Sequence, residues 1–222
     1  MMQVISIVAM TIDGFIGHPL KQRLKLSSDE DIFEVRKLRA ECDAILVGAA
    51  TIRKDNSTLI TTNWEHIQRR QQQGKCIDPI KATLTRTGDI SLESNFIKIG
   101  NCEKIIYTIN SFDKQRETEL SKVATVKKFE TETITARQIV EDLQERGVKK
   151  LIVEGGTDIL TMFFKENLVD ELRLSVVPFF VGDKRAPRFT HSGKFLFDKN
   201  NRMKLEKVEQ LGDTAVMHYM LK

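Results

Sequence analysis

The sequence predicts an α/β protein, a single domain over residues 1–222 with a mixed, mostly parallel central sheet flanked by helices. Short apolar runs rich in β-branched residues alternate along the chain with segments whose apolar residues recur at helical spacing. The chain then ends differently, in two strand-like segments, 203–210 and 214–221, parted by the turn residues Gly212–Asp213. That ending predicts an antiparallel C-terminal hairpin.

Each element has its own local signal. The expected strands before the hairpin are Val4–Met10, Ala44–Val47, Ile80–Thr85, Lys104–Thr108, Val123–Val126, Leu151–Val153 and Glu171–Val177. Capping boxes at Ser27/Glu30 and Thr135/Gln138 predict helices that end near residue 42 and at Gly147. Further helices are expected over 112–121, in a turn that Thr51 caps, and from Thr157. Residues 63–78 show little periodicity and are expected to be an exposed, disordered excursion.

The composition argues against several classes of protein. The net charge of +4 is spread along the chain, which gives no basic stripe for nucleic acid. Three dispersed cysteines and four dispersed histidines match neither a disulfide framework nor a metal site. The N-terminal run lacks a cationic leader and reaches Asp13 too soon for a signal peptide or a membrane span. We therefore expect a cytoplasmic protein with no metal and no membrane partner.

The segment LIVEGGTDIL, residues 151–160, carries the strongest functional signal. An apolar strand leads into Glu154 and Gly155–Gly156, and Thr157 then opens a helix. Adjacent glycines let the backbone approach an anion, and a helix N-terminus offers unpaired N–H groups. Taken alone, such a pair is better explained by a tight structural turn.

A second turn repeats this pattern. The run DAILVGAATIRKD, residues 43–55, again has an apolar strand, a glycine at its end and then a threonine. If the two strands are parallel neighbours, both turns lie at one sheet edge and border a common cleft that holds a dinucleotide. Glu154 should be largely buried there, so it requires a partner such as a ligand amine or ring N–H. Asp13 is expected to be a turn residue before Gly14.

Four motifs, in order along the chain, carry a family resemblance: MTIDGFIG, LSSDEDIFEVRKLRAECDAILVGAATIRKD, LIVEGGTDIL and LVDELRLSVVPFFVG. Together they resemble the riboflavin-biosynthesis pyrimidine reductases, the reductase half of the bifunctional deaminase–reductase. The resemblance implies a dihydrofolate reductase-like fold and NADPH-dependent reduction of a phosphoribosylamino-pyrimidine to its ribityl form. The substrate it implies is the uracil or the 2,5-diamino compound, and the assembly a homodimer, for which the apolar Leu172–Val181 stretch suits a two-fold sheet contact.

The resemblance also implies site residues. Cofactor contacts fall on Ala9, Thr51, Asp55, Gly155, Gly156, Thr157, Asp158, Ile159 and Leu160. Substrate contacts fall on Arg39, Leu59 and Glu154, with Glu154 reading the pyrimidine edge and Arg39 holding the phosphate. Asp55, Glu154 or water is the candidate proton donor. The chain lacks the zinc motif of the deaminase half.

The chain departs from the family pattern in four places. Asn56 and Ser57 replace Asp and Pro, and Thr62 stands where relatives can carry an arginine for the substrate phosphate. Arg23 or Lys25 is the candidate that compensates for Thr62. Arg86 replaces a small polar residue and is a candidate for the 2′-phosphate of NADPH.

Two other functions stay open. One is a dihydrofolate reductase-like enzyme acting on a pterin, which needs a carboxylate on the first helix, where Asp31 lies. The other is a non-catalytic NADPH-binding protein that lost turnover through the changes at Asn56, Ser57 and Thr62.

Overall fold

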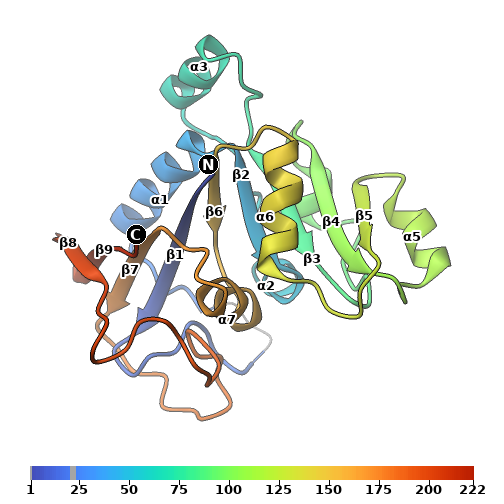
Figure 1. Ribbon diagram of the computed structural model, residues 1–222. Coiled ribbons are helices and arrows are strands. Elements are labelled where there is room, and N and C mark those ends of the chain that lie inside the picture. The colour runs from blue at the N-terminus through green and yellow to red at the C-terminus, as the bar shows by residue number, and fades with distance from the viewer. Residues whose placement is uncertain (1, 21–23) are drawn as a thin grey trace.

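The computed structural model describes residues 2–20 and 24–222 and contains one nine-stranded sheet (Figure 1). The strands are β1 Gln3–Thr11, β2 Ala44–Gly48, β3 Ile80–Leu84, β4 Lys104–Ile109, β5 Thr125–Phe129, β6 Lys150–Val153, β7 Glu171–Val177, β8 Lys204–Leu211 and β9 Thr214–Met220. The helices are α1 Asp29–Glu41, α2 Ala49–Asp55, α3 Trp64–Gln72, α4 Asn95–Lys98, α5 Lys114–Leu120, α6 Ala136–Glu145 and α7 Thr157–Lys165. The C-terminal hairpin and the predicted strands are therefore confirmed, except that the strand expected over Val123–Val126 lies later, at Thr125–Phe129.

The strand order is β5-β4-β3-β2-β6-β1-β7-β9-β8. Strands β1 to β7 run parallel, whereas β9 pairs antiparallel with both β7 and β8. The expected parallel pairing of the two turn-bearing strands is confirmed, because β2 lies directly beside β6. Strand β7 lies between β1 and β9, so the apolar stretch that begins at Leu172 is an interior strand and offers no free edge to a second copy.

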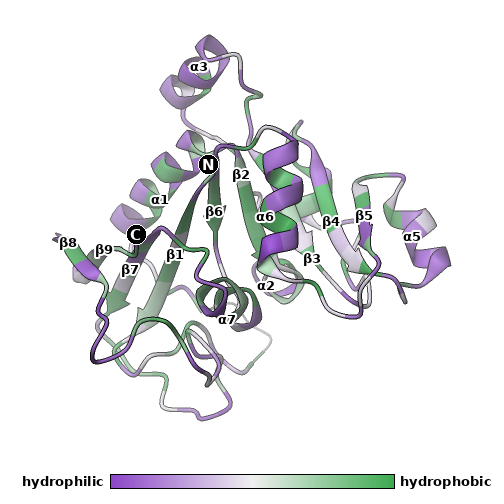
Figure 2. Ribbon diagram, in the orientation of Figure 1, coloured by the Kyte–Doolittle hydropathy of each residue, from purple (hydrophilic) through white to green (hydrophobic). Residues whose placement is uncertain are grey.

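Two apolar layers enclose the sheet. On one face, α6 and α7 cover residues such as Leu46 and Val153. On the other face, α1, α2, α4 and α5 cover alternate residues such as Ile45 and Ile152. Figure 2 shows this arrangement as apolar central strands beneath helices whose outer surfaces are hydrophilic. Side chains of successive strand residues therefore face different helices, which decides where the polar residues at the strand ends point.

The structure differs from the sequence prediction at the N-terminal caps of two helices. Ser28, one residue later than predicted, caps α1 by accepting from the N–H of Asp31. Helix α2 starts at Ala49 after Gly48, so Thr51 is a helical residue and not its cap. The capping box of Thr135 with Gln138 is confirmed.

The expectation that residues 63–78 are disordered is wrong, because Trp64–Gln72 forms the helix α3. Its apolar pattern is weak since it packs against α1 and hardly against the sheet, and Figure 1 shows it projecting beyond the end of the sheet. Side-chain polar bonds hold it instead. Asn63 caps it through Oδ1, and the buried Arg70 donates to the carbonyl oxygens of Ala40, Cys42 and Cys76 at 2.9, 2.5 and 2.8 Å.

The carboxyl ends of β1, β2 and β6 lie at one edge of the sheet, where the loops after β1 and β7 also gather (Figure 1). In open α/β sheets this edge is where ligands bind. Among the described residues, no helix has the length and apolarity needed to cross a membrane.

Candidate active site

A cleft of about 1100 Å³ opens at this edge. Both glycine-bearing segments line it, through residues 50, 51, 54–58 and 154–158, as the sequence predicted. The turns are also bonded to one another. Gly48 N–H donates to the Gly155 carbonyl at 2.9 Å, and Gly156 N–H donates to Thr51 Oγ1 at 3.2 Å. Thr51 thus joins the two turns from inside α2.

The local geometry favours glycine in both turns. Gly155 has φ of +86°, a conformation that disfavours any side chain with a Cβ. A Cβ on Gly48 would lie 3.3 Å from Ile159 and 3.4 Å from the Gly155 carbonyl oxygen. Helix α7 begins directly after Gly156 and has no side-chain cap. Its first N–H groups are therefore available to an anion in the cleft.

Glu154 and Arg39 form the central polar contact. Residue 154 follows Val153 on β6, and strand alternation turns its side chain toward α1. Arg39 lies in the last turn of α1 and reaches back, so that Nε and NH2 bind Oε1 and Oε2 at 2.6 and 2.5 Å. The Glu154 side chain is 11% exposed. Burial acts to lower the pKa of the Arg39 guanidinium, but the Glu154 carboxylate outweighs it and the pKa is raised.

This pair revises two expectations. Glu154 was expected to be largely buried with a ligand as partner, and the structure supplies a protein partner, Arg39. Arg39, expected at the substrate phosphate, uses two of its nitrogens on Glu154. Both residues nevertheless line the cleft.

Most of the other candidates meet in the cleft. Ala9, Thr51, Asp55, Gly155, Gly156, Thr157, Asp158 and Leu160 all line it. Lys25 lines it as well and pairs with Asp29 at 2.7 Å. Ser57 and Thr62 line it, as does Asn56, whose φ of 45° ends α2 and whose Oδ1 accepts from Asn95.

Four candidates lie elsewhere. Ile159 and Leu59 are each 3% exposed and belong to the two apolar cores. Arg86 is exposed just beyond the end of β3 and does not line the cleft. Arg23 lies outside the described residues.

The structure adds a segment that sequence reasoning missed. Residues 184–192 line the cleft and are basic, with Lys184, Arg185, Arg188 and His191. The segment lies over the start of α7, where Thr157 Oγ1 donates to the Arg188 carbonyl at 2.6 Å. The run DKRAPR was its only sequence signal, since it has no periodicity.

Asp13 holds the adjoining loop in place. Its carboxylate accepts from the N–H groups of Val181 and Gly182 at 3.2 and 2.8 Å, and from the Thr11 hydroxyl. Gly14 has φ of +82°, so the predicted turn is confirmed. Although desolvation raises the Asp13 pKa, these hydrogen bonds prevail and lower it.

Asp31 does not reach the cleft. It is fully buried and pairs with Arg173 at 2.7 Å, while Ser175 Oγ donates to it at 2.9 Å. A pterin-binding carboxylate has to face the ligand, so this contact argues against the pterin alternative. Among the described residues there is also no group of three or more metal-ligating side chains.

Fold and cleft together define an α/β protein with a cleft of about 1100 Å³ at the carboxyl ends of parallel strands. The chain belongs to the family of RibD C-terminal domains, whose model matches residues 2–217.

Similar proteins share most of the chain. The 2,5-diamino-6-ribosylamino-4(3H)-pyrimidinone 5′-phosphate reductase of Archaeoglobus fulgidus is 30% identical over 93% of this chain and 92% of its own. The reductase of the same name from Aquifex aeolicus is 28% identical over 89% and 86%. A pyrimidine reductase-like protein of Corynebacterium diphtheriae has the same fold, with a TM-score of 0.85 at 22% identity over 98% of this chain and 91% of its own.

Proposed function

We propose that this protein is an NADPH-dependent reductase of riboflavin biosynthesis. It converts the ribosyl group of a 5-phosphoribosylamino-pyrimidine, in the uracil or the 2,5-diamino form, to the ribityl group. The observation that carries the proposal is the single cleft bordered by both glycine turns, with the Glu154 carboxylate inside it. The names of the Archaeoglobus and Aquifex relatives support the same reaction.

The turns fit a dinucleotide. The uncapped start of α7 and the cradle at Gly155 and Gly156 suit a pyrophosphate, because Gly155 has a positive φ and the first N–H groups of α7 have no side-chain cap. Further contacts are assigned to Ala9, Thr51, Asp55, Thr157, Asp158 and Leu160, with Ile159 packing behind them. When bound, NADPH supplies the hydride for the sugar carbon. Arg86, at the same sheet edge beyond β3, is the proposed contact to its 2′-phosphate.

Glu154 is proposed to read the pyrimidine edge, because a carboxylate accepts hydrogen bonds from ring N–H and amino groups. Arg39 keeps the carboxylate oriented through two charge-assisted hydrogen bonds. The proton for the substrate nitrogen is proposed to come from Asp55, at the C-terminal end of α2 in the same cleft, from Glu154 or from water. Leu59 shapes the wall from within the core.

The assembly proposed is a homodimer in the cytoplasm. Strand β8 is a sheet edge whose Leu205 and Val208 are 51% and 58% exposed, an apolar surface that a second copy would cover. The three cysteines are free and Cys76 is exposed, which suits a reducing compartment.

A side-by-side assay tests the function. Purified protein with NADPH receives the uracil substrate, the 2,5-diamino substrate or dihydrofolate, and loss of the reduced-nicotinamide absorbance is followed. We expect NADPH to be oxidised when a phosphoribosylamino-pyrimidine is the substrate, and not when dihydrofolate is. Oxidation with dihydrofolate alone would assign a pterin reductase, and cofactor binding without any turnover would assign a binding protein.

A further inference from the structure

Helix α1 carries Arg39, and it is buried only near its two ends. Its buried residues are Asp31 in the first turn and Ala40 in the last. Arg173 of β7 holds the first end through its ion pair with Asp31. Ala40 directly follows Arg39, so the contacts that hold the second end also fix the point from which the Arg39 side chain extends.

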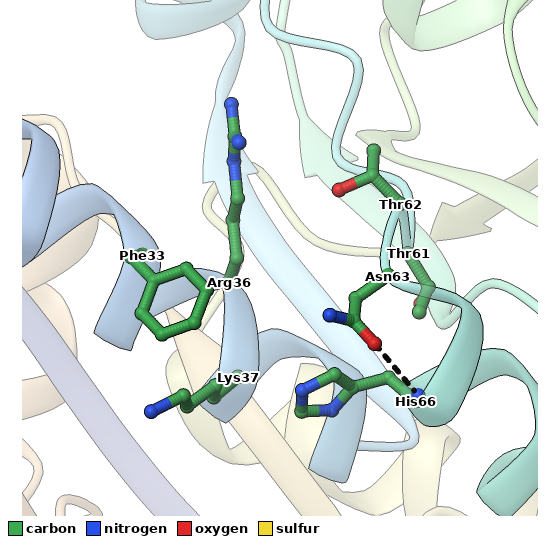
Figure 3. A pocket seen from close by; sticks show the side chains of 7 residues that line it. All are labelled: Phe33, Arg36, Lys37, Thr61, Thr62, Asn63 and His66. Carbon is green, nitrogen blue, oxygen red and sulfur yellow. Dashed lines mark hydrogen bonds between the residues drawn. The ribbon is translucent and has the colours of Figure 1, made fainter.

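The middle of α1 faces an open space. A cavity of about 200 Å³ lies between it and residues 61–66, the segment that leads into α3. Figure 3 shows side chains of α1 on one side of this cavity and those of the segment on the other. Seven residues line it: Phe33, Arg36, Lys37, Thr61, Thr62, Asn63 and His66. Because side chains do not fill this part of the boundary, the position of α1 depends on the contacts at its ends.

Arg70 of α3 makes the contact at the C-terminal end of α1. It is 3% exposed, and its NH1 donates to the carbonyl oxygens of Ala40 and Cys42 at 2.9 and 2.5 Å. Its Nε donates to the carbonyl oxygen of Cys76 at 2.8 Å. The last carbonyl groups of a helix lack partners within the helix, and the helix dipole favours a cation beside them. Arg70 therefore caps α1 from a different helix.

The segment that follows Arg70 also holds the strand that leads to Glu154. Lys75 pairs with Asp43 at 2.7 Å. The Asp43 carboxylate in turn accepts from two N–H groups at the start of β6, at 2.9 and 3.0 Å. Residues 70–75 are thus bonded to the end of the helix that carries Arg39 and, through Asp43, to the strand that ends at Glu154.

We infer that Arg70 is a positioning residue for the active site. It lines neither cavity. It fixes the last turn of α1 and with it Arg39, whose two hydrogen bonds orient the Glu154 carboxylate. The inference rests on the proposed function, in which Glu154 reads the pyrimidine, and deepens it. Helix α3 contributes no residue to the cleft, and by this role it still supports the chemistry there.

Arg70→Gln tests the inference by steady-state kinetics and an NADPH titration. The amide cannot bond all three carbonyl groups, so the end of α1 should shift and displace Arg39 and Glu154. Since a displacement of about 1 Å can cost about 100-fold in rate, we expect kcat/KM for the pyrimidine to fall by about 10- to 100-fold. The affinity for NADPH should stay within about 2-fold, because the glycine turns keep their contacts.

Two other arginine variants are the controls. Arg146→Gln removes bonds to Asp142 and Glu103 at the C-terminal end of α6, outside the cleft. It should lower the Tm as Arg70→Gln does, but leave kcat/KM unchanged. Arg69→Gln, at an exposed residue of α3, should change neither quantity. The inference is overturned if Arg70→Gln keeps the wild-type kcat/KM, or if Arg146→Gln loses as much.

A double variant shows whether Arg70 acts through Glu154. Two independent losses multiply, whereas two losses through one group do not. When added to Glu154→Gln, Arg70→Gln should therefore lower kcat/KM by no more than about 2-fold further. A further loss as large as in the wild-type background would overturn the inference. If Arg70→Gln does not fold, Arg70→Lys, which keeps the cation, takes its place in each comparison with a smaller expected loss.

The NMR signal of the Arg39 Nε–H group gives a readout that needs no turnover. This group donates to Glu154 Oε1, so its proton should exchange slowly with solvent in the wild type and in Arg146→Gln. Arg39→Lys removes the signal and so identifies it. Exchange should be about 10-fold faster in Arg70→Gln. If no pyrimidine is reduced but this pattern holds, the proposed function fails and the positioning role stands. If Arg70→Gln leaves the exchange unchanged, the positioning role fails.

Discussion

At the scale of single residues, Glu154 shows how burial and pairing define a role. Sequence alone indicated a carboxylate at the end of a buried strand, and therefore a need for a partner. It did not identify Arg39, because that contact joins residues 115 positions apart and depends on how α1 packs across the sheet. Strand alternation places Glu154 on the α1 face, and the helix length then brings Arg39 to it.

Glu154→Gln should lower turnover strongly and leave NADPH affinity within a few-fold. The amide keeps the shape of the side chain but loses the charge that binds Arg39 and the pyrimidine, which is worth about 100-fold or more in kcat. Steady-state kinetics and a cofactor titration measure the two effects. Glu41→Gln, at the exposed end of α1, is the control. Equal losses in turnover and cofactor affinity would show that Glu154 is a structural residue instead.

At the scale of elements, the sequence predicted those that bury apolar faces and missed those that polar contacts hold. Runs such as Val4–Met10 and the Thr135 capping box each carry a local signal, and the structure confirms them. Helix α3 lacks an apolar stripe, and its stability comes from the long-range bonds of Arg70, which no local pattern reveals. The choice of Ser27 over Ser28 as cap failed because adjacent serines offer the same signal.

Helix α1 is anchored by a buried ion pair. Asp31 and Arg173 are 0% and 2% exposed, and Asp31 Oδ2 and Arg173 NH2 lack hydrogen-bond partners among the described residues. Asp31→Asn should therefore lower the free energy of unfolding by about 3–5 kcal/mol, because the Arg173 charge stays buried without a counterion.

Urea denaturation measures this loss. Asp29→Asn is the matched control, since its pair with Lys25 is exposed and such pairs contribute about 0–1 kcal/mol. Replacing both Asp31 and Arg173 by leucine and methionine should be milder than the single change. If Asp31→Asn is as stable as Asp29→Asn, the buried pair contributes nothing to the free energy of unfolding.

Helix α6 is joined to β4 by a second buried carboxylate, whose effect depends on pH. Asp142 Oδ2 accepts from Tyr107 Oη at 2.8 Å and from Arg146 Nε at 2.7 Å. Burial acts to raise the Asp142 pKa. The hydrogen bonds from these two partners lower it by more, so the pKa lies below its ordinary value. Its contribution to stability is therefore complete above the unfolded value of about 4, and is lost as the pH falls through the folded pKa.

Asp142→Asn should destabilise the protein by about 1–3 kcal/mol at pH 7 and by less at pH 3. Denaturant curves of the wild type and the variant at each pH give the difference in their free energies of unfolding. The other carboxylates are the same in both proteins, so their contributions cancel. A loss that is the same at both pH values would show that packing, and not the charge, accounts for it.

At the scale of the whole molecule, the two glycine turns come from adjacent strands, so a ligand between them connects α2 and α7. NADPH at about 100 times its Kd should add about 2.7 kcal/mol, which corresponds to about 5–10 °C in Tm for a chain of this size. Differential scanning calorimetry of wild type and Glu154→Gln should show the same shift in both. No shift with any reduced nicotinamide nucleotide would remove the basis of the proposed function.

The molecule also shows why part of the site was predictable. Cofactor candidates came from short contiguous motifs, and all but Ile159 and Arg86 line the cleft. The basic segment 184–192 and the cavity beside Arg36 are assembled from loops and helices distant in sequence, where no spacing rule applies.

Among the described residues, none between positions 63 and 153 lines the cleft. Both chain ends meet at Asp170, which accepts from Val4 N–H at 2.7 Å and from Leu221 N–H at 2.8 Å. A circular permutant is thus geometrically natural: a short linker would join the present termini, and new ones would open in the exposed turn 130–133. Such a rearranged chain should keep every residue that lines the cleft on uninterrupted segments, because the stretch that is opened contributes none of them.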